Sequence, residues 1–108
     1  MKITERVMLR LKAESPDPVV IQDYVKIVTD RLNLRLGETI LPTEFESIAA
    51  DATVKLYRRA MFEGISSEGT DGLTTSFVSD ILAEYADEIA AYKENKAKTD
   101  GERTIYFL

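Results

Sequence analysis

Apolar side chains recur every three or four residues along most of this chain, which is the spacing of one face of an α-helix. The pattern predicts four helical segments, at approximately residues 2–13, 18–36, 44–63 and 78–96. Each segment has an apolar stripe and a polar side, so the stripes are expected to pack against one another. The sequence therefore predicts a mainly α fold, a small bundle of three to four helices.

The ends of the predicted helices carry local signals. Asp17 is a favourable N-cap residue, and Pro18 fits the first helical turn because its missing N–H is not needed there. Gly37 follows the second helix and is suited to end it. Thr43 and Glu46 are three residues apart and predict a capping box at the start of the third helix.

The second predicted helix is apolar on more than one side. Its main stripe consists of Ile21, Tyr24, Val25, Val28 and Leu32. Three apolar residues spaced seven positions apart widen this stripe: Val20, Ile27 and Leu34. We therefore expect this helix to be buried on two sides. Four tyrosines on apolar helical faces are expected to pack in the core: Tyr24, Tyr57, Tyr85 and Tyr92.

A long segment, Glu63 to Phe77, separates the last two predicted helices. It contains three of the five glycines, with Gly64 placed to end the third helix, and it also carries apolar residues. Connections between helices in a bundle usually have about two to eight residues, so this loop is long. Its hydroxyl residues would shape turns, with Ser76 or Ser79 as the N-cap of the fourth helix. A binding role is favoured over a simple connection because long loops are often functional.

The C-terminal tail has a different character. Lys93 to Asp100 are polar, Asp100-Gly101 is a turn signal, and Arg103 to Leu108 are typical of a short β-strand. A single strand cannot satisfy its own backbone hydrogen bonds. The strand would therefore pair either with residues 73–77 of the same chain or with a neighbouring subunit. In the second case the tail, residues 97–108, would form a contact between subunits.

Composition narrows the function classes. The 108 residues predict one domain, 1–108, and they include neither histidine nor cysteine, which removes the commonest general base and transition-metal ligands. The net charge is −5, of which residues 61–108 contribute −6. An acidic surface repels a nucleic-acid backbone. No apolar run is long enough for a membrane span, and the first residues lack the apolar core of a signal peptide.

No pattern of a catalytic or cofactor site accompanies these helices. The glycines do not match a phosphate-binding loop. Glu84 and Glu88 share a helical face, but a solvated acidic face explains them better than a metal site. Arg58 and Arg59 are expected to complement the end of the third helix rather than to bind DNA. We expect no enzyme and no cofactor; the alternatives are a small regulatory or DNA-binding module and, third, a carboxylate-based enzyme.

Several strings in the second half of the chain resemble the head–tail connector family of tailed bacteriophages, the adaptor or head-completion proteins. They are Leu41-Pro42, the helix from Asp51 to Arg59, Glu63-Gly64-Ile65-Ser66-Ser67-Glu68, Gly72-Leu73-Thr74-Thr75-Ser76-Phe77, Asp80-Ile81-Leu82, Tyr85, Glu88-Ile89, Tyr92 and Arg103 to Leu108. Residues 41–108 carry most of this resemblance, and residues 1–40 share the helical layout.

The resemblance implies a structural virion protein at the head–tail interface, present in the host cytoplasm during assembly. Such a protein forms a ring of about twelve copies under the portal, extends the DNA channel and docks the next connector or a tail component. DNA passes without specific binding, and no membrane is involved. The implied subunit or portal contacts are Ile65, Ser66, Ser67, Glu68, Leu73, Ser76, Phe77, Ile105, Tyr106 and Phe107. Because acids repel passing DNA, four residues are candidates for the channel wall: Asp80, Glu84, Asp87 and Glu88.

Overall fold

The computed structural model describes the backbone of residues 2–62 and 71–106, and the side chains of residues 2–62 and 76–98. Its α-helices are α1 (Ile3–Arg10), α2 (Pro18–Leu36), α3 (Glu46–Phe62), α4 (Asp71–Ala83) and α5 (Ala86–Tyr106). Two short 3₁₀ turns, η1 (Lys12–Glu14) and η2 (Thr43–Phe45), precede α2 and α3. The prediction of a mainly α-helical bundle is confirmed.

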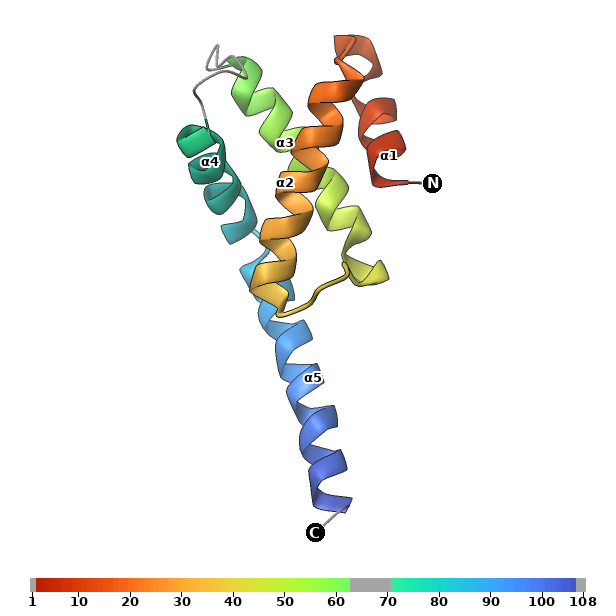
Figure 1. Ribbon diagram of the computed structural model, residues 1–108, viewed down its shortest axis with the longest axis vertical. Helices are drawn as coiled ribbons and strands as arrows, with labels where there is room; N and C mark the ends of the chain where they lie inside the picture. Colours follow the sequence, from red (N-terminus) through yellow and green to blue (C-terminus); the bar gives the residue numbers. More distant parts are fainter. Residues whose placement is uncertain (1, 63–70, 107–108) are drawn as a thin grey trace.

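The helices α2 and α3 form the centre of the molecule (Figure 1). The short α1 packs beside them on one side, and α4 packs against α3 on the other. Helix α5 starts beneath the bundle and continues away from it, so that the longest dimension of the molecule is 57 Å. The chain therefore consists of a packed body and a projecting helix.

Both predicted ends of α2 are confirmed. The carboxylate of Asp17 accepts a hydrogen bond from the backbone N–H of Val19 at 2.9 Å, with Pro18 as the first helical residue. At the other end Gly37 adopts φ 72° and ψ 31°. A residue with a side chain is strained in this left-handed conformation, whereas glycine is not. The local sequence alone thus determines where α2 begins and ends.

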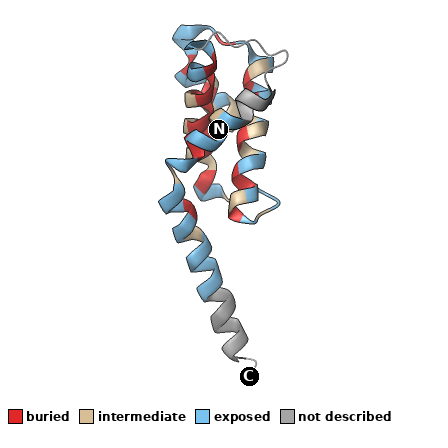
Figure 2. Ribbon diagram, turned by 90° about the vertical axis from the view of Figure 1, so that its left-hand side faces the viewer, coloured by how far each residue is buried: buried red, intermediate tan, exposed pale blue. Residues whose placement is uncertain are grey.

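The core lies where α1, α2 and α4 meet α3 (Figure 2). Small residues on α3 lie inside the core, since Ala49 and Ala52 are completely buried. Leu56, one turn further along α3, is also completely buried. Thr53 is buried as well, and its hydroxyl donates to the carbonyl of Ala49 at 2.7 Å. The polar group at the centre of the core is therefore satisfied within its own helix.

The predicted core tyrosines divide into two pairs. Tyr24 and Tyr57 are buried, as expected. Tyr85 and Tyr92 are half-buried and pack at the edge of the core. The ring of Tyr92 meets that of Phe45 edge-on, with centroids 5.4 Å apart. This contact joins the first turns of α5 to η2, directly before α3.

Two predictions about α2 and α3 are wrong. Leu34 is 73% exposed, while Val20 and Ile27 are only half-buried, so α2 is not buried on two sides. Too few helices surround α2 to cover this second stripe. Thr43 is not an N-cap: it is the first residue of the 3₁₀ turn, whose cap position is held by Pro42.

The prediction of one helix from residue 78 to 96 is also wrong. Helix α4 begins at Asp71, and the chain turns at Glu84 and Tyr85 before α5 starts. Ser76 and Ser79 are consequently inside a helix and are not N-caps. Packing extends to the residue before the predicted start, because Phe77 is half-buried against the core, next to the buried Val78. The predicted loop 63–77 is therefore shorter than expected, and Gly64 lies outside the described residues.

The predicted C-terminal strand is not found in the described part of the chain. The backbone of residues 103–106 belongs to α5 instead. The segment 73–77, which was the expected strand partner within the chain, is itself helical in α4. Without a partner a strand leaves its hydrogen-bonding groups unpaired, whereas a helix satisfies them internally. Residues 107–108 lie outside the described residues.

Candidate interaction surfaces

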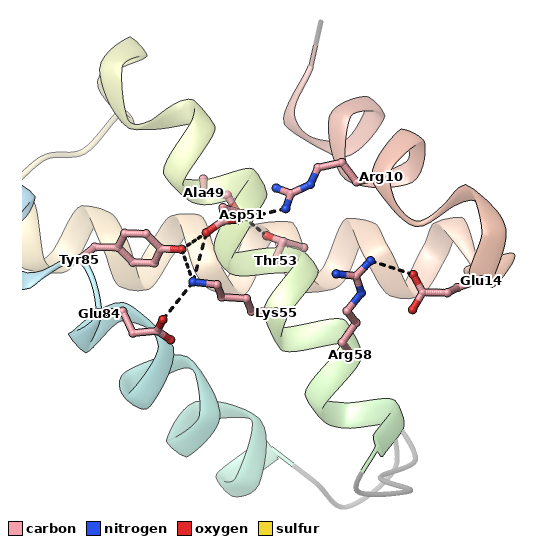
Figure 3. Close-up of polar contacts among 9 residues, drawn as sticks. All are labelled: Arg10, Glu14, Ala49, Asp51, Thr53, Lys55, Arg58, Glu84 and Tyr85. Carbon is pink, nitrogen blue, oxygen red and sulfur yellow. Dashed lines mark hydrogen bonds and ion pairs between the residues drawn. The ribbon is translucent and has the colours of Figure 1, made fainter.

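A cluster of polar side chains fixes the joint between α4 and α5 (Figure 3). The ammonium Nζ of Lys55, on α3, lies 3.0 Å from a carboxylate oxygen of Glu84 and 3.0 Å from the hydroxyl of Tyr85. It also lies 3.3 Å from Asp51, one turn earlier on α3. The hydroxyl of Tyr85 donates a hydrogen bond to Asp51. Both residues of the turn are thus held by side chains of α3.

The cluster extends to the first helix. Arg10 on α1 donates to the second carboxylate oxygen of Asp51 at 3.1 Å, so Asp51 joins α1, α3 and the α4–α5 joint. Partial burial raises the pKa of Asp51, but hydrogen bonds from Tyr85, Arg10 and Lys55 outweigh it and hold that pKa below its ordinary value. The hydrogen bond with Tyr85 and the carboxylate of Glu84 raise the pKa of Lys55. The arrangement therefore favours the charged forms of both groups.

The turn between α4 and α5 has no local sequence cause. Residues 78–96 contain neither proline nor glycine, the usual sources of a helix break. The backbone N–H groups of Glu84 and Tyr85 bond to residues three positions earlier, Ile81 and Leu82, in the tight 3₁₀ manner. The contacts with Lys55 and Asp51 hold the turn from α3. Sequence reasoning missed this joint because its partners lie about thirty residues away.

The four predicted channel residues are all exposed, but they differ in their partners. Asp80 pairs with Arg59 of α3 at 3.4 Å, and Glu84 pairs with Lys55. Asp87 and Glu88, in the first turn of α5, form no ion pair among the described residues. The acidic face is solvated as predicted, and half of its charge is balanced by α3.

The predicted contact residues in or near the loop can be placed only in part. Ser76 is exposed, and Phe77 is half-buried beneath Arg59, whose guanidinium carbon lies 4.4 Å from the ring centroid. The backbones of Leu73, Ile105 and Tyr106 lie in α4 and α5, while their side chains are outside the described set. The remaining predicted contacts are entirely outside the described residues: Ile65, Ser66, Ser67, Glu68 and Phe107.

The two arginines near the end of α3 are occupied by contacts within the chain. Arg58 pairs with Glu14 at 3.3 Å, and Arg59 contacts both Asp80 and Phe77. These contacts tie the end of α3 to η1 and to α4. Neither arginine contributes to a basic patch of the kind that binds a phosphate backbone.

Large apolar side chains on the surface are a second feature that sequence reasoning did not find. Those of Val19, Leu34, Ile40 and Phe62 are all more than 70% exposed. Leu34 was expected in the core, and Phe62 was part of the third helix without an assigned role. Helical spacing identifies apolar residues but does not tell which of them lacks a covering neighbour. Apolar side chains of this kind are candidates for contacts with other proteins.

An open groove of about 530 Å³ runs along the joint, between α2 on one side and α4 and α5 on the other. It is lined by Arg35, Ser79, Leu82, Ala83, Ala86, Ile89, Ala90 and Lys93. Its lining comes from both sides of the α4–α5 turn, so the groove exists only because the helix is broken there. A prediction of one continuous helix could not reveal it.

The described part of the chain shows no sign of a metal site or a membrane span. Among those residues no three histidine, cysteine or acidic side chains are gathered as a metal would require. Within the same residues, no helix is both apolar and long enough to cross a lipid bilayer.

Comparison with known proteins identifies a family that this chain matches. Residues 5–93, from α1 into α5, match the family described as phage gp6-like head-tail connector protein. No curated protein and no solved structure matches the chain significantly. The matched segment contains the body, the α4–α5 joint and the groove. The chain therefore belongs to the phage gp6-like head–tail connector family, whose members are structural proteins of the head–tail interface and not enzymes.

Proposed function

We propose that copies of this connector form a ring of about twelve under the phage portal, where they extend the DNA channel and dock the next connector or a tail component. The observation that supports this most is the projection of α5 from the body (Figure 1). All residues from Lys93 to Lys98 are exposed. A helix with so little contact to its own chain gains stability when neighbouring subunits or the portal cover it.

The connections of α5 to the body support a defined direction for this projection. Tyr92 packs on Phe45, and Lys96 pairs with Glu38 in the connection that precedes α3. Together with the Lys55 cluster at the joint, these contacts orient α5 relative to the body. Copies with the same orientation can repeat the same contact around a closed ring.

The channel wall is also part of the proposal. Asp80 and Glu84 are candidates for it, and each is paired with a cation of α3. A wall of paired charges has a weak net field, so it would neither hold DNA nor strongly repel it. This is the behaviour expected of a channel through which DNA passes without specific binding.

The proposal is tested by mixing the purified protein with its cognate portal ring and imaging the mixture by electron microscopy. We expect a collar with closed cyclic symmetry, of about twelve copies, on one end of the portal. A gel-shift measurement with duplex DNA is the control, and we expect no complex. Absence of binding to the portal at any concentration, or tight binding to DNA instead, would overturn the proposal.

A further inference from the structure

The groove beside the α4–α5 joint has cations on both of its rims. Arg35 of α2 stands on one rim and Lys93 of α5 on the other. Arg35 donates to the hydroxyl of Ser79 at 3.4 Å and to the carbonyl of Arg31 at 3.2 Å, both of which are uncharged. Neither Arg35 nor Lys93 forms an ion pair with a described residue.

The lining of the groove combines an apolar floor with small residues. Its floor is formed by Leu82 and Ile89, which are buried, and its walls include three small exposed residues, Ala83, Ala86 and Ala90. Helices approach one another most closely where the side chains at the contact are small. An apolar floor with small walls and two cations therefore suits a helix that carries carboxylates along its contact side.

The same chain carries such a surface on the other side of α5. An α-helix turns by about 100° per residue, so Ala86, Ala90 and Lys93 lie on one side of α5. Asp87 and Glu88 point away from that side, are exposed and form no ion pair among the described residues. The small residue Ala91, also exposed, lies between them one turn later. The groove and this carboxylate face are thus on opposite sides of one helix.

We propose that the groove of one copy receives the carboxylate face of α5 of the next copy, with Asp87 and Glu88 near Arg35 and Lys93. This inference rests on the proposed ring and deepens it by naming the surfaces between subunits. Two complementary surfaces on opposite sides of a subunit produce a head-to-tail contact, which closes into a ring when the rotation is right. Complementary charge also fixes the register of such a contact.

This assignment moves Asp87 and Glu88 from the channel wall to the contact between subunits, while Asp80 and Glu84 remain candidates for the wall. Carboxylates in the first turn of a helix also stabilise it by interacting with the helix dipole. That effect acts within one chain. It predicts a small loss of stability when Asp87 and Glu88 are replaced, and no effect on assembly.

The test uses two charge-reversed proteins. The groove variant carries Arg35→Glu and Lys93→Glu, and the face variant carries Asp87→Lys and Glu88→Lys. In either variant alone, groove and face have the same sign, so neighbouring copies repel. In an equimolar mixture, each groove meets a face of opposite sign, and an alternating ring can form. Collars on the cognate portal are counted by electron microscopy, and copies per portal are measured by native mass spectrometry.

We expect full collars with the wild-type protein, at least tenfold fewer with either variant alone, and recovery of full collars with the mixture. The reversal of Asp23 to Lys, at an exposed site of α2 far from the groove, is the control and should leave collars intact. Circular dichroism confirms folding of each variant. Arg35 is half-buried, so the groove variant could fail to fold. In that case two single substitutions are used instead, Lys93→Glu for the groove and Asp87→Lys for the face.

Each alternative outcome is decisive. Full collars with both single variants would overturn the inference and leave the proposed function intact. Loss of collars without recovery in the mixture would also overturn it, since these residues would then serve another contact, such as that with the portal. Absence of collars even with the wild-type protein would instead overturn the proposed function.

Discussion

The body and the α5 helix are built by different means. In α3, at the centre of the body, about half of the side chains are buried, and Ala52 and Leu56 are completely buried. In α5, Ile89 is the one buried side chain among those described, and residues 93–98 are all exposed. Burial of apolar surface stabilises the body, whereas residues 93–98 of α5 bury no side chain and are tied to the body through the ion pair of Lys96 with Glu38.

The difference has a consequence for assembly. In proteins most of the stability of a helix comes from packing of one of its faces and not from helix propensity alone. In α5 the packing partner is largely missing from the same chain, and the surface pair Glu94–Lys98, 4.0 Å apart, contributes little. We infer that the body folds on its own, while α5 reaches its full stability in contact with other subunits.

The largest expected effect is in the body. The substitution Leu56→Ala removes a completely buried side chain from α3 and should lower the free energy of unfolding by about 2–5 kcal/mol. Leu34→Ala is the matched control, because the same change on the exposed side of α2 should cost less than about 0.5 kcal/mol. Urea unfolding followed by circular dichroism measures both. Equal losses would mean that the surface of α2 is covered.

The joint between the two regions should show an intermediate effect. Lys55→Met removes hydrogen bonds to Tyr85 and Glu84 and should cost about 1–2 kcal/mol in the free energy of unfolding. Lys26→Met is the control: among the described residues Lys26 pairs with Asp30 alone, on the exposed surface of α2, and this substitution should cost about 0.5 kcal/mol or less. Similar losses in the two variants would show that the Lys55 cluster does not hold the joint.

The same variant tests the direction of α5. The chain has no cysteine, so two cysteines introduced at Ser76 and Lys98 can be spin-labelled without side reactions. In the wild-type background we expect one narrow distribution of distances between the labels. With Lys55→Met the distribution should broaden, because local sequence favours a continuous helix and the contacts that oppose it are weakened. An unchanged distribution would mean that other packing orients α5.

The contrast between local and distant causes also explains what the sequence could predict. Asp17 and Gly37 act on their own backbone, so the ends of α2 were identified correctly. The turn at Glu84 and Tyr85 depends on Lys55 and Asp51, which lie about thirty residues earlier in the sequence. The groove depends on the same α4–α5 turn and on Arg35 of α2. Periodicity describes one helix at a time and therefore predicted the bundle but not the surfaces between its helices.

Acid should affect the joint through Asp51. The native structure lowers the pKa of Asp51, so its charged form contributes stability above the ordinary carboxyl value of 3.8, and this contribution is lost as the pH falls through the lower native pKa. We expect Asp51→Asn to reduce stability at neutral pH and to flatten the acid decline of the unfolding free energy. Urea titrations between about pH 7 and about pH 2 measure this. If the unfolding free energy of Asp51→Asn fell with acid as steeply as that of the wild type, other carboxylates would be responsible for the decline.

The smallest effect on global stability is expected in the outer part of α5, and there it is the most informative. Glycine in place of alanine inside a helix costs about 1 kcal/mol of helix stability. Ala52→Gly changes a buried site of α3, which unfolds together with the body. The free energy of global unfolding should therefore fall by at least this cost. In Ala97→Gly, at an exposed site of α5, global unfolding should change by less than about 0.5 kcal/mol, since no described core residue depends on that turn.

Hydrogen exchange distinguishes the two cases. The amides of residues 93–98 should lose protection in Ala97→Gly while those of α3 keep it, because the outer part of α5 opens separately from the body. Bound to the cognate portal in a collar, the same amides should become protected in the wild-type protein. An equal loss of global stability in Ala52→Gly and Ala97→Gly would show that α5 belongs to the cooperative unit of the body. The outer part of α5 would then be stable within its own chain and would not need a neighbouring subunit for its stability.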